Sequence, residues 1–222
     1  MRKILFILSV FLFAQAYSQE KDKKLVSLDA LLSETQFSSD APKMLDFVWW
    51  LPREFWAVSN AQDPTSSEKD FIELNNLFED YELFGIIRGD VGNFGGITYH
   101  PREAILKELT VNYKGENLIV VPEEEISADL LNFFMIMQPM LGNMLGQMGN
   151  NMHFILFKSI RGSEVLPINP LQNEILTINL GDYERTVDLP LNSLLIEKKC
   201  PEDGKLYSGK YIFCPIHGKK LI

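Results

Sequence analysis

The chain has 222 residues, 46% of them hydrophobic, and a formal net charge of −9. This length allows one large domain, or a domain with a small appendage, to bury a full core. The excess of acidic residues makes nucleic acid and anionic membrane surfaces poor partners for the protein as a whole.

The first eighteen residues have the pattern of a secretory signal peptide. Arg2 and Lys3 form a basic start, and an apolar run up to Phe13 precedes small residues that fit a cleavage site after Ser18. Removing Arg2 and Lys3 leaves 19 basic and 30 acidic residues, a net charge of −11. We therefore expect a soluble mature chain, residues 19–222, that is exported to the periplasm or secreted.

No membrane span is expected in the mature chain. The best candidate, residues 130–145, is too short and is interrupted by Gln138, Pro139 and Gly142.

The N-terminal part of the mature chain predicts helices. Leu28, Leu31 and Leu32 have helical spacing, and Ser27 before them suits a helix N-cap. Proline is tolerated in the first turn of a helix, so two further short helices are expected to open near residues 42 and 52. The apolar residues of segment 67–81 also share one helical face, which predicts another helix.

After residue 81 the apolar pattern changes from a helical to a strand-like period. Two hairpins are expected first, over residues 83–100 and 106–121. A long helix rich in methionine follows over residues 122–148, then a single strand over 152–158 and a third hairpin over 175–189. A kink is expected near Pro139. The absence of alternating strands and helices predicts an α+β fold with a mainly antiparallel sheet or β-sandwich of about seven strands. We divide the chain into a signal peptide (residues 1–18), an α+β body (residues 19–198) and a ribbon-like C-terminal appendage (residues 199–222).

The motifs of several large enzyme classes are absent. The sequence contains no Gly-x-Ser-x-Gly, no His-Glu-x-x-His and no phosphate-binding Gly-x-x-x-x-Gly-Lys. It has three histidines in all. We therefore favour a protein without a catalytic centre.

Two groups of side chains are candidates for a partner surface. Four methionines have the spacing of one helix face: Met137, Met140, Met144 and Met148. Such a face forms a buried seam, an adaptable binding groove or, less readily, a copper site. The second group is Trp49, Trp50 and Trp56, which form either part of the core or a partner surface.

The C-terminal tail carries both cysteines of the chain. Cys200 and Cys214 each begin a Cys-Pro-x-x-Gly sequence. This pattern resembles a zinc ribbon, in which two Cys-Pro-x-Cys-Gly knuckles supply four thiolates. Asp203 and His217 stand where the second cysteine of each knuckle is expected, so the resemblance implies the ligand set Cys200, Asp203, Cys214 and His217, all able to bind Zn²⁺.

An alternative for the tail follows from export. Two cysteines in an exported protein most simply form a disulfide, and in a ribbon the sulfurs of Cys200 and Cys214 are neighbours. Closing this loop of about fifteen residues is worth about 3 kcal/mol in the chain-entropy model. Free thiols are a third alternative, whereas redox catalysis is not expected without a Cys-x-x-Cys sequence.

Three segments of the body carry a second resemblance. They are Trp-Leu-Pro-x-Glu-Phe-Trp at residues 50–56, Phe-Gly-Gly-Ile-Thr-Tyr at 94–99 and Asn-Met-His-Phe at 151–154. They resemble a set of exported bacterial proteins of unknown activity that end in a similar Cys-Pro tail, and this resemblance implies no activity. We expect a non-catalytic module that binds an unknown protein or small ligand. No cofactor is expected for such a module. The alternative is a protein that binds zinc or, less readily, copper.

Overall fold

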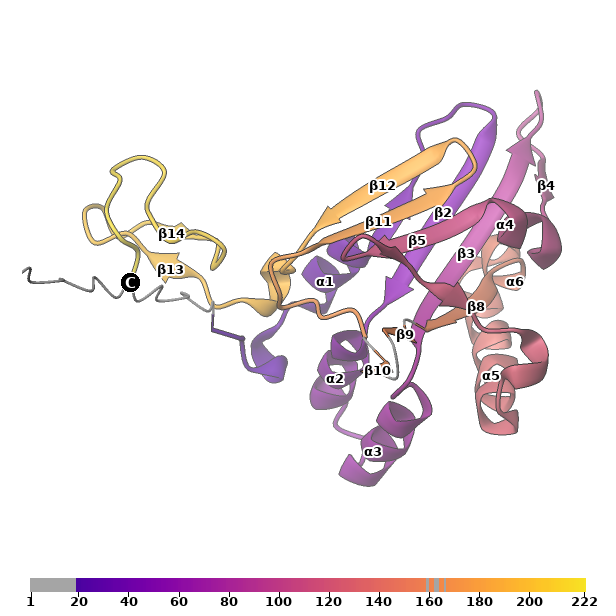
Figure 1. Cartoon of the computed structure of the whole chain (residues 1–222), viewed down its shortest axis with the longest axis horizontal. Coiled ribbons are helices and arrows are strands. Elements are labelled where there is room, and N and C mark those ends of the chain that lie inside the picture. The colour runs from indigo at the N-terminus through magenta and orange to yellow at the C-terminus, as the bar shows by residue number, and fades with distance from the viewer. Residues whose placement is uncertain (1–18, 159, 162–163, 166) are drawn as a thin grey trace, which may run out of the picture.

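The computed structural model describes residues 19–158, 160–161, 164–165 and 167–222 (Figure 1). The predicted signal peptide, residues 1–18, lies outside this range. Within the described residues the strands pair in antiparallel sheets and the helices lie outside them, which confirms the predicted α+β class.

The larger sheet has six strands, in the order β1-β2-β3-β8-β7 with β4 beside the end of β3. These strands are β1 (Gln36–Ser38), β2 (Met44–Leu51), β3 (Glu82–Val91), β4 (Ile97–Tyr99), β7 (Ile119–Val120) and β8 (His153–Lys158). The first eight residues of β3 are all buried. A strand that is buried throughout must be covered on both faces, so β3 is the centre of the fold.

A four-stranded sheet covers one face of the larger sheet (Figure 1). Its order is β12-β11-β5-β6, and its strands are β5 (Leu109–Tyr113), β6 (Glu116–Asn117), β11 (Ile175–Leu180) and β12 (Tyr183–Asp188). Alternate residues of β5 and β11 are buried in the same core as β3. The two layers form a sandwich with more strands than the predicted seven.

Helices cover the other face and the ends of the sandwich (Figure 1). They are α1 (Leu28–Thr35), α2 (Arg53–Gln62), α3 (Glu68–Leu77), α4 (Arg102–Glu108), α5 (Ala128–Leu145) and α6 (Gln147–Asn150). Short elements complete the body: the 3-10 turns η1 (Lys23–Leu25), η2 (Glu123–Glu125) and η3 (Asn192–Leu194), and the strand pair β9 (Ile160–Arg161) and β10 (Glu164–Val165).

Serine side chains set the start of three helices. The hydroxyls of Ser27, Ser67 and Ser127 each accept a hydrogen bond from a backbone N–H in the first turn that follows. Such a cap satisfies one of the N–H groups that a helix leaves unpaired at its start. The predicted cap at Ser27 is thereby confirmed.

The helix predicted to open at Pro42 is wrong. The segment forms strand β2, which pairs with β3 along its whole length, from Met44 opposite Asp90 to Leu51 opposite Leu83. Tertiary pairing overrides the local helical spacing here because the aromatic and β-branched residues of the segment fit a buried strand. The prediction at Pro52 is confirmed, since helix α2 begins at Arg53.

Aromatic rings join helix α5 to the sandwich. Phe133 makes edge-to-face contacts with Trp56 and Phe78, at centroid distances of 5.7 and 5.4 Å. The ring of Phe134 stacks on Phe154 of β8 at 5.0 Å. The side of α5 that carries these two phenylalanines is therefore anchored to the core.

Glu82 is an acidic side chain buried inside the sandwich. Its carboxyl accepts hydrogen bonds from Trp50 Nε1 at 3.1 Å and from the Ile168 backbone N–H at 2.7 Å. The pKa of Glu82 is raised to about 8, because burial raises it by more than these two hydrogen bonds lower it. The folded protein therefore binds a proton at Glu82 more tightly than the unfolded chain does.

This difference predicts a loss of stability as the pH rises from about 4.5 to about 8. In that window the unfolded chain releases the Glu82 proton and the folded protein keeps it, so unfolding becomes easier by at most about 1.4 kcal/mol per pH unit. Glu82→Gln should flatten the pH dependence of the free energy of unfolding, because the amide does not titrate. Any destabilisation that the amide causes is the same at every pH. Urea unfolding at pH 5, 6.5 and 8 measures the slope, with the exposed Glu184→Gln as the control. Equal slopes in wild type and Glu82→Gln would contradict the prediction.

Candidate metal centre

The C-terminal tail forms a small ribbon beside the sandwich (Figure 1). Strand β13 (Lys198–Lys199) pairs with β14 (Leu206–Tyr207), and on its other side Lys199 exchanges two backbone hydrogen bonds with Ile222, at 2.6 and 2.9 Å. The ribbon has a core of its own that contains Cys200, Cys214 and Leu221, with Tyr207 packed against it. We call residues 198–222 the ribbon.

The two Cys-Pro-x-x-Gly sequences fold in the same way. In the first, the Gly204 N–H donates to the Cys200 carbonyl and the Cys200 N–H donates to the Lys205 carbonyl, both at 2.9 Å. The second knuckle repeats this pattern, with the Gly218 N–H donating to the Cys214 carbonyl at 2.9 Å. Both glycines have a positive φ, +74° and +64°, which side chains disfavour. The final glycine of each knuckle is therefore a backbone requirement.

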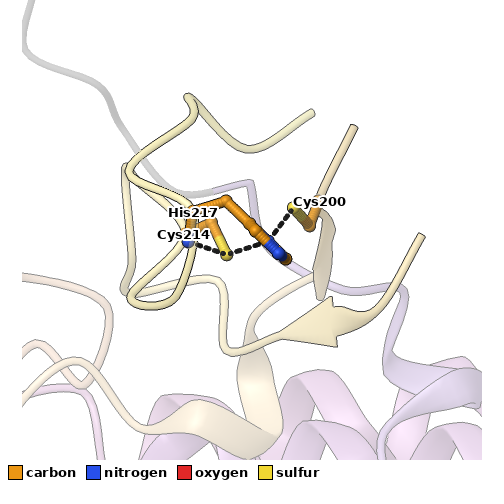
Figure 2. A group of neighbouring side chains, drawn as sticks. All are labelled: Cys200, Cys214 and His217. Atoms are coloured by element: carbon orange, nitrogen blue, oxygen red, sulfur yellow. Dashed lines mark hydrogen bonds between the residues drawn. The ribbon is translucent and has the colours of Figure 1, made fainter. Parts of the chain in front are cut away.

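The knuckles bring three metal-binding side chains together (Figure 2). Cys200 Sγ, Cys214 Sγ and His217 Nδ1 all lie within 4.8 Å of one another. The ring nitrogen of His217 is 3.5 Å from each sulfur. A sulfur and a nitrogen bound to one tetrahedral Zn²⁺, at the usual bond lengths, are about 3.6 Å apart. The observed spacing is therefore that of two ligands on one ion.

Asp203 lies next to this group but is not part of it. It occupies in the first knuckle the position that His217 occupies in the second, and its Oδ2 is 3.9 Å from His217 Nδ1. Its Oδ1 accepts the Lys205 N–H at 3.0 Å, and this hydrogen bond holds the pKa of Asp203 below its usual range. The structure thus joins three of the four predicted ligands and places an ionised carboxylate beside them.

The predicted Cys200–Cys214 disulfide is not formed in the structure. Both sulfurs are unbonded, although both residues are buried. A disulfide requires a sulfur–sulfur distance of about 2.05 Å. Here His217 Nδ1 lies 3.5 Å from each of the two sulfurs, which are not bonded to each other (Figure 2).

The two thiols differ in acidity because they sit in different surroundings. Burial raises the pKa of Cys200. Burial also opposes ionisation of Cys214, but the backbone N–H groups of His217 and Ile216, together with the side chains of Tyr207 and Cys200, outweigh it and lower the pKa of Cys214 to about 6. The His217 N–H donates to Cys214 Sγ at 3.4 Å. The lowered pKa favours the thiolate of Cys214, which is the form that binds metals.

Tyr207 is a site residue that the sequence did not single out. Its side chain packs against the two cysteines, and its buried hydroxyl has no hydrogen-bond partner within the described chain beyond the nearby Cys214 sulfur. Cys214 and burial raise the pKa of Tyr207 to about 12. The sequence carries no signal for this role, because the inward direction of Tyr207 is known only once strand β14 pairs with β13 and leaves Leu206 exposed.

The methionines do not share one environment. Met140 and Met144 are exposed, Met137 is half-buried, and Met148 packs against the main core. Among the described residues, the ribbon is the one group of three or more His, Cys, Asp or Glu side chains with the spacing of metal ligands. A copper site often adds such a group to its methionines, and the methionines of α5 have none beside them in the described chain.

The tryptophans belong to the core. Trp50 is fully buried and Trp49 is 8% exposed, because both lie on β2 in the middle of the larger sheet. Trp56 packs against the same core through its contacts with Phe55 and Phe78. The core interpretation is confirmed, and the partner-surface prediction is wrong for Trp49 and Trp50.

The remaining histidines lie far from the ribbon in the chain. His100 Nε2 is 2.9 Å from Asp90 Oδ2 at the exit of the β3–β4 hairpin. His153 Nε2 is 3.2 Å from the His100 carbonyl, and burial lowers the pKa of His153. Each of these two rings therefore has one polar partner within the sheet.

Comparison of the chain with protein-family models, with curated proteins and with solved structures finds no match. Within the described residues, no helix has the length and apolar character needed to cross a membrane.

The ribbon is held to the sandwich by polar contacts. The Lys210 ammonium donates to the Asp188 carbonyl at 2.8 Å, and the Ser208 hydroxyl hydrogen-bonds to Asn192. The Glu34 carboxylate accepts the N–H groups at the start of η3, which precedes the ribbon. These contacts are hydrogen bonds, each of which contributes about 1 kcal/mol, or up to about 3 kcal/mol where a charged group takes part.

We therefore predict that Cys214→Ser loosens the ribbon and leaves the sandwich folded. The ribbon should become sensitive to limited proteolysis, while the free energy of unfolding of the sandwich changes by less than about 1 kcal/mol. Near-ultraviolet circular dichroism, which reports the buried tryptophans, checks the sandwich. Loss of that signal would show that the ribbon is part of the main core and would contradict the prediction.

Proposed function

We propose that this chain is an exported zinc-binding protein whose C-terminal ribbon holds one Zn²⁺ ion. The observation that carries the proposal is the meeting of Cys200, Cys214 and His217 within 4.8 Å. The signal-peptide pattern of residues 1–18 supports export.

The donor atoms favour zinc over other common metals. Two thiolates and an imidazole suit Zn²⁺, whereas Mg²⁺ and Ca²⁺ require oxygen ligands. Asp203 is the best-placed fourth ligand, because its ionised Oδ2 lies 3.9 Å from His217 Nδ1 and two oxygen or nitrogen ligands of one zinc are about 3.4 Å apart. A change of side-chain torsion covers that difference. The site would then be closed, with four ligands from the protein.

A closed zinc site of this kind would act as a structural staple. The core of the ribbon consists of Cys200, Cys214 and Leu221, with Tyr207 against them, which is too small to hold a fold by apolar burial alone. Zinc would link the two knuckles, and its binding energy would stabilise the folded ribbon directly. The same burial that limits access to the two sulfurs would protect them from oxidation while they are bound.

The proposal predicts one zinc per chain in protein purified without reductant. Elemental analysis measures the metal, and a chromophoric chelator measures its affinity. Cys200→Ser and Cys214→Ser should abolish stoichiometric zinc, and His217→Ala should weaken binding at least tenfold, because each removes a donor from the cluster. Asp203→Asn should weaken it about tenfold while keeping the shape of the knuckle.

His100→Ala is the matched control, because His100 also lies close to an aspartate but has no cysteine beside it. It should retain zinc. Titration of thiols with and without the chelator separates the alternatives: two thiols released together with zinc support the proposal. No zinc, and thiols that appear only after chemical reduction, would instead establish a disulfide and contradict it.

A further inference from the structure

Helix α5 exposes apolar side chains that have no partner in the described chain. Six large ones are between 37% and 75% exposed: Leu131, Met135, Ile136, Met140, Met144 and Leu145. The inward side of the helix buries Leu130 and Leu141. A helix that is apolar all round is normally buried on all sides, yet α5 lies at the periphery of the sandwich (Figure 1). Its outer side is therefore suited to a further partner.

A groove follows the first half of this helix. It has a volume of about 540 Å³, and its lining includes Leu131, Phe134, Met135 and Gln138. Leu131, Met135 and Gln138 are spaced by four and three residues, so the groove runs along the helix axis. Phe134 is fixed by its stacking on Phe154 at 5.0 Å. The groove thus combines an anchored aromatic ring with flexible methionine side chains, which adapt to varied apolar partners.

One end of the groove is acidic. Glu123 lines it, and Glu124 and Asp129 are exposed close by in the chain. Glu125 is already paired with Lys158 at 3.0 Å. The sequence has no lysine or arginine from residue 122 to residue 152, so no basic side chain of this segment neutralises these acids. The apolar groove therefore has a negative rim at the start of α5.

We propose that this groove binds an amphipathic helix of a partner protein, with apolar residues on one face and lysine or arginine beside them. The apolar face would lie along α5 between residues 131 and 144, a length of about 20 Å, and the basic residues would lie against the acidic rim. The proposal is independent of zinc binding by the ribbon.

Charge complementarity selects this occupant over two others. A second copy of the chain carries the same acidic rim and the same net charge of −9, so its approach is opposed by repulsion. An anionic membrane is opposed for the same reason. A basic helix is attracted by the rim and buries the methionines, so both features of the groove are used.

The test uses the mature chain, residues 19–222, as purified, and a fluorescently labelled 18-residue helical peptide of leucine and lysine with the leucines on one face. Two control peptides are used. The first has the same composition in scrambled order, and the second has glutamate in place of lysine. Fluorescence anisotropy should give at least about tenfold weaker binding for each control peptide, because one lacks the apolar face and the other lacks the charge. Equal binding of all three peptides would overturn the proposal.

Variants locate the site on the protein. Met135→Gln and Met140→Gln should each raise the Kd for the leucine–lysine peptide by about tenfold, and both positions are exposed, so circular dichroism should show an unchanged fold. The double change Glu123→Gln and Glu124→Gln should raise the Kd at low salt and reduce its salt dependence. Ile175→Gln and Glu184→Gln, at exposed positions of the smaller sheet, are the matched controls and should leave the Kd unchanged.

Three results would overturn the proposal. The first is a Kd that the α5 variants leave unchanged or that the control variants raise equally. The second is a dimer in sedimentation velocity that Met135→Gln dissociates, which would assign the face to a second copy. The third is flotation of the chain with vesicles of neutral lipid that Met135→Gln abolishes, which would assign it to a membrane surface.

Discussion

Burial of strand β3 on both faces is the constraint on which the rest of the structure depends. A strand whose residues from Glu82 to Gly89 are all buried needs a cover on each side. The smaller sheet supplies one cover, and the aromatic contacts that reach from Trp49 to Phe55 and from Phe154 to Phe134 supply the other. The same burial explains the raised pKa of Glu82, because a carboxyl inside this core is ionised only against the cost of desolvation.

The ribbon also depends on how its small core is held together. It is too short to bury much apolar surface, so its fold depends on the knuckle hydrogen bonds and on what joins the two sulfurs. His217 extends the set of donors from two to three, and the Asp203 carboxylate lies beside them. A metal ion at this point would therefore stabilise the ribbon without the sandwich having to change, and the polar contacts between the two parts would then fix their orientation.

Local sequence signals predicted most of the body. The caps at Ser27 and the proline before α2 act within one turn of helix, so they can be recognised without tertiary information. The segment after Pro42 was mistaken for a helix because its apolar residues satisfy both periods, and only pairing with β3 makes it a strand. In the ribbon, Cys200, Cys214 and His217 could be predicted from the repeated knuckle, whereas Tyr207 could not be selected before its neighbours in space were known.

The sequence by itself determined the α+β class, the acidic charge and the residues that form the knuckles, because composition, period and glycine positions act over short distances along the chain. Tertiary structure decided which apolar residues are covered. Trp49 and Trp50 are buried because β2 lies inside a sheet, and Met140 and Met144 are exposed because no other element packs on the outer side of α5 in the described chain. It also decided that His217 Nδ1 lies 3.5 Å from each of two unbonded sulfurs, since these distances depend on how both knuckles fold against each other.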